Sequence, residues 1–344
     1  MKNFSSKINL RIFTSFVFLL LCCKCGYSDE SAVDSIKALG GNIVRNDTGN
    51  VIEVSFFNTR IGDAGLVHLK GLTSLATLDL QKTNITDAGL AQLKGLTNLT
   101  TLNITDNEIS DAGLIHLKGL TNLTTLYLTN TRISDAGLVH LKLLTNLKTL
   151  YLIHTRISDA GLVHLQGLSK LNTLFFLHNN IGDAGLAHLK DMTSLTALNL
   201  EFTDITDAGL AHLRKLSNLT ILNLRSTIIS DAGLVHLKEL SKLTILNLSN
   251  TDISDAGLVH LERLPNLTKL NLSYDYISDA GLVHLKGMTN LITLNLEDSD
   301  ITDAGLIHLK GLSRLTSLDL SGTKVTYEGV LKLKAAIPNC KITD

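Results

Sequence analysis

The chain has few aromatic residues, almost no proline and, beyond its N-terminal segment, a single cysteine. Aromatic residues make up 4% of the 344 residues and tryptophan is absent, so the hydrophobic core must be built from aliphatic side chains. The only prolines are Pro265 and Pro338, and no low-complexity linker suggests a domain boundary. Cys340 is the only cysteine after residue 28, which excludes an internal disulfide in that part of the protein.

A basic surface is lacking as well. The formal net charge of the chain is -1, and the first 28 residues contain four basic residues and no acidic ones. The remainder is therefore mildly acidic. Because a nucleic-acid-binding face must neutralise phosphates with lysine and arginine, we expect no nucleic-acid partner.

The N-terminal segment has the pattern of an export signal. Lys2, Lys7 and Arg11 precede an apolar run over residues 12–23, which is shorter than the ~20 residues that a membrane-spanning helix needs. Small residues at positions 26 and 28 favour cleavage before Asp29. The sequence thus predicts a signal peptide over 1–28 and an exported mature protein, in the periplasm, in the cell envelope or secreted.

Two other interpretations of this segment stay open. One is an uncleaved anchor. The other is a lipoprotein, because residues 20–23 loosely resemble a lipobox in which Cys23 carries the lipid. A lipid at Cys23 would be the only membrane attachment that we expect.

Internal repetition dominates the rest of the chain. The tetrapeptide Asp-Ala-Gly-Leu occurs eleven times at a constant spacing of 24 residues, from Asp63 to Asp303, and a degenerate twelfth copy begins at Tyr327. In one unit, the alternation of Leu102 and Ile104 predicts a short strand with two inward side chains. Leucines at 114, 117 and 120 have helical spacing, and Ser110 or Asp111 can cap the helix that they predict.

Stacked units of this kind share one core, because no single unit can bury its own apolar side chains. Strands repeating in one direction must form a parallel sheet, with the helices outside it. Strands stack about 4.8 Å apart and helices about 10 Å apart, so the stack must curve. The sequence therefore predicts an α/β solenoid, a horseshoe with a concave parallel sheet and convex helices.

The repeat pattern L-x-x-L-x-L-x-x-T-x-I-[ST]-D-A-G-L-x-x-L covers residues 51–333 in about 12 repeats and resembles that of leucine-rich-repeat proteins. It looks most like the bacterial 24-residue type with Asp-Ala-Gly-Leu. It is also similar to the repeats of F-box adaptors, although no F-box-like segment precedes it. We expect an N-terminal cap at 29–50, with a helix starting at Ser31 and a hairpin over 43–54. We expect a C-terminal cap at 334–344, where Cys340 begins a last strand.

Catalytic and metal-binding motifs are not evident. Ten of the twelve histidines, from His68 to His308, occupy the same helix position in successive repeats. At about 10 Å apart, neighbouring histidines cannot share a zinc ion. The sequence has no glycine-rich phosphate loop and no Ser, His and Asp order that is independent of the repeat. We expect no enzyme, no metal and no cofactor.

The outward positions of the concave face differ most between repeats. Alternation makes Phe176 an inward residue and Phe175 an outward one. Scarce aromatic residues gather at outward positions of neighbouring repeats, which is typical of an interaction surface. The partner-binding residues predicted in this way are Tyr127, Tyr151, Ile153, His154, Phe175, Leu177, His178 and Phe202. The competing interpretation is that these rings only stabilise the sheet by cross-strand packing.

A run of asparagines from Asn199 to Asn295 occupies the middle outward position of five repeats. We expect their amides to hydrogen-bond along a ladder, and a glycan could also use them. Taken together, the sequence predicts a non-catalytic, exported protein-binding scaffold that uses its concave face. A structural cell-envelope protein without a dedicated ligand and a glycan-binding protein are the alternatives.

Overall fold

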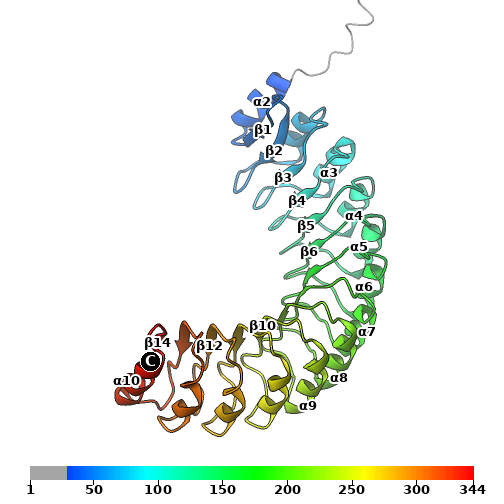
Figure 1. Cartoon of the computed structure of the whole chain (residues 1–344). Helices are drawn as coiled ribbons and strands as arrows, with labels where there is room; N and C mark the ends of the chain where they lie inside the picture. The colour runs from blue at the N-terminus through cyan, green and yellow to red at the C-terminus, as the bar shows by residue number, and fades with distance from the viewer. Residues whose placement is uncertain (1–28) are drawn as a thin grey trace, which may run out of the picture.

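The computed structural model describes residues 29–344, so the predicted signal peptide and Cys23 lie outside the described residues. Fourteen strands form one sheet in which each strand neighbours the next in chain order. The sheet lines the inside of an arc and the short helices lie on its outside (Figure 1). The predicted α/β solenoid with a concave, mostly parallel sheet is thus confirmed.

The strands of the repeats are only three residues long, so each contains one inward leucine, and the second predicted inward residue, such as Ile104, lies just after its strand. The strands are β1 (Asn42–Arg45), β2 (Val51–Ser55), β3 (Thr77–Asp79), β4 (Thr101–Asn103), β5 (Thr125–Tyr127), β6 (Thr149–Tyr151), β7 (Thr173–Phe175), β8 (Ala197–Asn199), β9 (Ile221–Asn223), β10 (Ile245–Asn247), β11 (Lys269–Asn271), β12 (Thr293–Asn295), β13 (Ser317–Asp319) and β14 (Lys341–Thr343).

In the repeats the convex side is made of short helical turns. The α-helical segments are α2 (Asp29–Ala38), α3 (Asp87–Leu90), α4 (Asp111–Leu114), α5 (Asp135–Leu138), α6 (Asp159–Leu162), α7 (Asp183–Leu189), α8 (Asp207–Leu210), α9 (Asp231–Leu234) and α10 (Tyr327–Ala336). Tighter 3₁₀ turns follow or replace them at Asp63–Leu69, Ala91–Gly95, Ile115–Leu117, Val139–Leu143, Val163–Leu165, Ala211–Lys215, Val235–Glu239, Gly257–Arg263, Gly281–Leu285 and Gly305–Leu309. The two longest helices, α2 and α10, lie at the two ends of the solenoid. No helix within residues 29–344 is long and apolar enough to cross a membrane.

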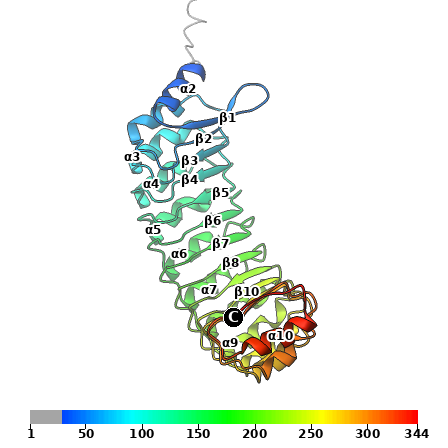
Figure 2. The ribbon, with the colours of Figure 1, turned by 90° about the vertical axis from the view of Figure 1, so that its left-hand side faces the viewer.

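Both ends of the sheet have additional elements. At the N-terminal end, β1 pairs antiparallel with β2, with a register shift at Arg45, and α2 packs beside them (Figure 2). At the other end, β14 pairs in parallel with β13, and Cys340 is buried just before it. The hairpin, the first helix and the last strand that the sequence predicts are therefore present, although the helix begins at Asp29, two residues before the predicted start at Ser31.

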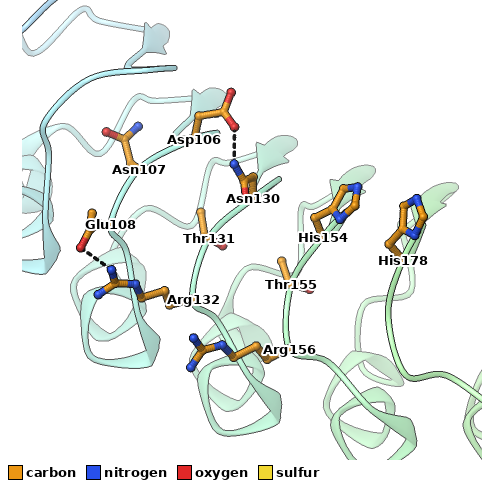
Figure 3. Close-up of a pocket in the computed structure, with 10 residues that line it drawn as sticks. All are labelled: Asp106, Asn107, Glu108, Asn130, Thr131, Arg132, His154, Thr155, Arg156 and His178. Carbon is orange, nitrogen blue, oxygen red and sulfur yellow. Dashed lines mark hydrogen bonds and ion pairs between the residues drawn. The ribbon is translucent and has the colours of Figure 1, made fainter.

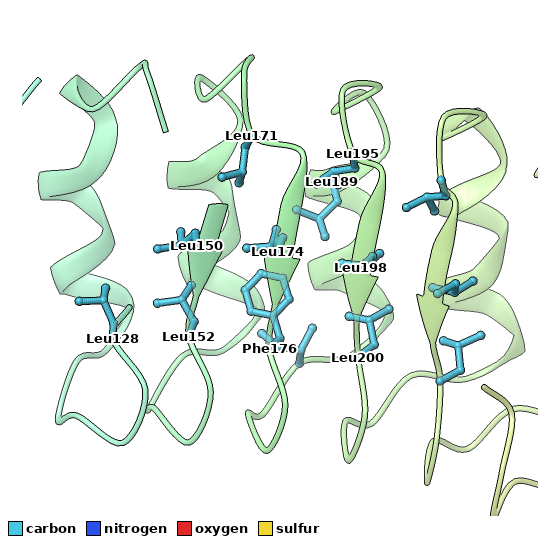
Figure 4. Close-up of a cluster of buried hydrophobic side chains, with 14 of the residues drawn as sticks. Leu128, Leu150, Leu152, Leu171, Leu174, Phe176, Leu189, Leu195, Leu198 and Leu200 are labelled. Atoms are coloured by element: carbon cyan, nitrogen blue, oxygen red, sulfur yellow. The ribbon is translucent and has the colours of Figure 1, made fainter. Parts of the chain in front are cut away.

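The core consists of columns of leucine that run through the whole arc. In β7, Leu174 and the following Phe176 are fully buried, and Phe176 replaces a leucine in its column (Figure 4). Phe175 between them is half-buried on the concave face. The predicted register is confirmed, because a slip of one residue would exchange the environments of Phe175 and Phe176.

The repeated aspartate joins each repeat to the next one. Asp111 Oδ1 accepts a hydrogen bond from the backbone N–H of Ser134 at 2.7 Å, and Asp111 Oδ2 accepts one from Ser134 Oγ at 2.6 Å. The same backbone bond recurs in every repeat from Asp63 to Asp303. The helix cap comes instead from the preceding hydroxyl in several repeats, as where Ser110 accepts from Ala112 N. Of the two caps proposed from sequence, Ser110 is right and Asp111 has another role.

The glycine of the tetrapeptide leaves room for that aspartate. A Cβ atom at Gly137 would lie 2.4 Å from Asp111 Oδ1 of the preceding repeat and 3.1 Å from Ile133 Cγ2. Atoms at the shorter distance overlap. A side chain at this position would therefore separate neighbouring repeats at the point where the aspartate bridges them.

Candidate binding surface

Three aromatic rings form a row across the middle of the concave face. Figure 2 shows the strands of this face as a ribbon. The strands β5, β6 and β7 pair in parallel and in register, which places Tyr127 beside Tyr151 and Tyr151 beside Phe175. The Tyr127 and Tyr151 rings stack, with centroids 4.6 Å apart and an angle of 11° between their planes. Phe175 meets Tyr151 edge to face at 4.9 Å. We call these three residues the aromatic row.

A second row of planar side chains lies three residues further along each repeat. The rings of His154 and His178 stack at 4.2 Å, and those of His178 and Phe202 stack at 4.3 Å. The guanidinium carbon of Arg225 lies 5.7 Å from the centroid of the Phe202 ring, within the range of a cation–π contact. His154, His178 and Phe202, which are all exposed, form what we call the turn row.

The backbone of the turn row is in the left-handed region. The φ angles are 50° at His154, 56° at His178 and 53° at Phe202. Most other repeats place Asn, Asp, Ser or Lys at this position, and of these Asn and Asp tolerate the conformation best. A bulky phenylalanine in this conformation reduces the folding stability by more, of order 1 kcal/mol. Backbone bonds between repeats, such as His154 N–H to Leu177 O at 2.9 Å, hold the turn in place.

Six of the eight residues that the sequence predicts as a patch thus lie in two adjacent rows. Ile153 and Leu177 connect the rows and are half-buried. Burial raises the pKa of the Tyr151 hydroxyl, and the neighbouring Tyr127 raises it further. Tyr151 therefore stays neutral near pH 7.

Sequence reasoning missed a polar hollow beside the turn row. It has a volume of about 520 Å³ and lies against the loops of four consecutive repeats, from Asp106 to His178 (Figure 3). His154 and His178 belong to both the turn row and the hollow. Arg132 and Arg156 line it from the position two residues after the turn row. An alignment of the repeats contains this signal, because two successive repeats have arginine there.

The asparagine run does not form the ladder that we expected. Within residues 29–344, no hydrogen bond joins two of these amides. Each Oδ1 accepts instead from the backbone N–H two residues later, as where Glu201 N–H donates to Asn199 Oδ1 at 2.9 Å. The local N–H is within reach of the short side chain, so the amide oxygen is already used. The predicted hydrogen bonds between neighbouring asparagine amides are therefore wrong.

The convex histidines, all half-buried, are spread along the whole arc. His284 Nδ1 lies 2.7 Å from Glu262 Oε1, and burial lowers the pKa of His236. In the described part of the chain, no three His, Cys, Asp or Glu side chains are grouped so that they could hold a metal ion.

Stacked 24-residue units with a concave parallel sheet define a repeat solenoid, and comparison with protein families agrees. The "Leucine rich repeat" family models match residues 73–133 and 265–325 in one form and residues 191–213, 215–238 and 239–261 in another. Together these matches cover more than half of the chain. The chain is therefore a leucine-rich-repeat protein.

Solved structures with a similar fold include bacterial proteins of this class. An internalin from Listeria monocytogenes is 24% identical, with a TM-score of 0.69 over 92% of this chain and 94% of that one. A leucine-rich-repeat protein of Leptospira interrogans is 18% identical, with a TM-score of 0.61 over 81% and 74% of the two chains. The PEPR1–AtPEP1 complex is 19% identical, with a TM-score of 0.51 over 88% of this chain and 49% of that one. No curated protein matches the chain in sequence.

Proposed function

We propose that this protein is a non-catalytic scaffold that binds another protein with the middle of its concave face, outside the cytoplasm. The observation that carries the proposal is that the aromatic row and the turn row together extend across four neighbouring repeats. Aromatic residues are 4% of the chain, and here they lie on the surface. Buried aromatic anchors dominate the binding energy of many protein interfaces.

The backbone of the turn row supports the same conclusion. Most other repeats make the turn with Asn, Asp, Ser or Lys, and Tyr274 is another aromatic residue at this position. The fold therefore does not require His154, His178 and Phe202 there. Backbone strain that the fold does not need is concentrated at functional sites. The complex of PEPR1 with AtPEP1 has a similar solenoid fold, which makes a protein or peptide ligand a reasonable expectation for this chain.

The test is affinity capture with residues 29–344 as bait, followed by measurement of Kd for each retained protein. Replacing Tyr151 and Phe175 by Ser should weaken binding about thirtyfold or more per residue, because an interface anchor contributes about 2 kcal/mol or more. A matched control replaces Tyr276 and Tyr327, which are 71% and 73% exposed and lie outside both rows. Equal binding by both double variants would contradict the proposal.

The export part of the proposal rests on the N-terminal sequence. N-terminal sequencing of the protein from the extracytoplasmic fraction should give Asp29 as the first residue. A lipid at Cys23 would favour the lipoprotein interpretation, and an intact Met1 in the cytosol would contradict both.

A further inference from the structure

The hollow beside the turn row has two carboxylates at one end, and both have a partner within the chain. Glu108 Oε2 lies 2.7 Å from Arg132 Nη2. Asp106 Oδ1 accepts a hydrogen bond from Asn130 Nδ2 at 2.7 Å, and Figure 3 shows both contacts. Glu108 and Arg132 therefore form an ion pair, whereas the partner of Asp106 is an uncharged amide.

The other end of the hollow has a cation without a partner. Arg156 is exposed, and its guanidinium has no hydrogen bond or ion pair within residues 29–344. It points along the hollow beside the paired Arg132 (Figure 3). The equivalent residue of the preceding repeat is Arg132 and that of the next repeat is the neutral Asn180, so neither neighbour supplies a carboxylate to Arg156.

A second unpaired cation lies on the opposite side of the aromatic row in the same repeat. Lys148 is exposed, precedes Tyr151 by three residues, and its ammonium has no partner in the described part of the chain. Lys148 and Arg156 thus stand at the two ends of this repeat's strand, three residues before and five residues after Tyr151. Neither cation has an ion-pair partner within residues 29–344.

We propose that the occupant of this surface is an acidic, extended peptide segment of the partner protein. Its carboxylates would pair with Arg156 and Lys148, and an apolar side chain between them would rest on the aromatic row. A guanidinium matches a carboxylate with two parallel hydrogen bonds. Because Lys148 and Arg156 belong to one repeat, such a peptide would run along the direction of β6 and cross the aromatic row at Tyr151. This inference rests on the proposed function and specifies the chemistry of the partner.

The test uses a display library of random twelve-residue peptides, selected on residues 29–344. We expect enriched peptides to combine Asp or Glu with an apolar residue. The Kd of a fluorescein-labelled enriched peptide is then measured by anisotropy for the wild type, Arg156→Gln and Arg156→Lys. Arg156→Gln should raise Kd about tenfold or more, and Arg156→Lys should restore part of the loss. The control is Arg60→Gln, an exposed arginine at the equivalent position of the first repeat.

Four outcomes would overturn the inference. They are a library without binders, enriched peptides without an excess of acidic residues, a Kd that Arg156→Gln leaves unchanged, and self-association of the chain that Arg156→Gln abolishes. The last outcome would make a second copy of the chain the occupant. If Tyr151→Ser weakens peptide binding and Arg156→Gln does not, the proposed function stands and only the acidic partner is wrong. If neither substitution matters, both fail.

Discussion

Asp275 is a buried carboxyl group at a position where most other repeats have Thr or Asn. Its Oδ1 accepts hydrogen bonds from Thr251 N at 2.8 Å and Thr251 Oγ1 at 3.0 Å. Its Oδ2 is buried and has no hydrogen-bond partner. Asn107 at the equivalent position donates from Nδ2 to Leu80 O at 2.7 Å and to Ile104 O at 3.2 Å. An ionised Asp275 cannot donate in this way, whereas an amide or a protonated carboxyl can.

Replacing Asp275 by Asn should therefore stabilise the protein, and the gain should grow with pH. Burial raises the pKa of Asp275 from 3.8 to about 8, and the charge of Asp252 adds to this. Because the folded-state pKa is above the unfolded-state value, Asp275 destabilises the wild type least below about pH 4. The wild type loses ~1.4 kcal/mol per pH unit between the two pKa values. The full loss is about 4 kcal/mol at pH 7, and water reaching the carboxylate reduces it, so we expect a gain of about 2–4 kcal/mol.

The assay is urea unfolding of residues 29–344 at pH 4.5, 6, 7 and 8, with circular dichroism as the signal. The difference in free energy of unfolding between Asp275→Asn and the wild type should be near zero at pH 4.5 and increase steadily to pH 8. All other ionisable groups are common to both proteins, so the difference isolates Asp275. The control, Asp204→Asn, changes an exposed aspartate and should show no such trend. A difference independent of pH would refute the reasoning.

Three further predictions concern packing and the turn row. Gly137→Ala should destabilise the protein by about 1–3 kcal/mol, because its Cβ would overlap the aspartate of the preceding repeat. Gly119→Ala, with no atom within 4 Å of the new Cβ, should stabilise the protein by ~0.4–1 kcal/mol. A higher urea midpoint for Gly137→Ala than for Gly119→Ala would contradict both expectations. Phe176→Ala should cost about 3–5 kcal/mol and Phe175→Ala about 1 kcal/mol, so equal losses in thermal unfolding would mean that the register is wrong. Phe202→Asn should be more stable than Phe202→Ala by ~1 kcal/mol, because Asn tolerates the left-handed turn; equal stabilities would argue against strain there.

The repeat period by itself determined the fold, the register and the membership of the surface patch. A constant spacing of 24 residues puts equivalent positions side by side in the sheet, so alternation alone distinguishes the buried Phe176 from the outward Phe175. The same spacing predicts that Tyr127, Tyr151 and Phe175 lie side by side on neighbouring strands.

Only the tertiary structure decided what individual side chains do across the boundary between repeats. Asp111 follows Ser110 at a helix start, yet its carboxylate bonds to Ser134 of the next repeat. Arg132 and Arg156 occupy equivalent positions in neighbouring repeats. The preceding repeat offers Glu108 to Arg132 but only Arg132 to Arg156, so Arg132 is paired and Arg156 is not. The physical reason is that a period specifies which positions become neighbours, whereas pairing, stacking and backbone strain depend on which side chains meet there and on the distances between their atoms.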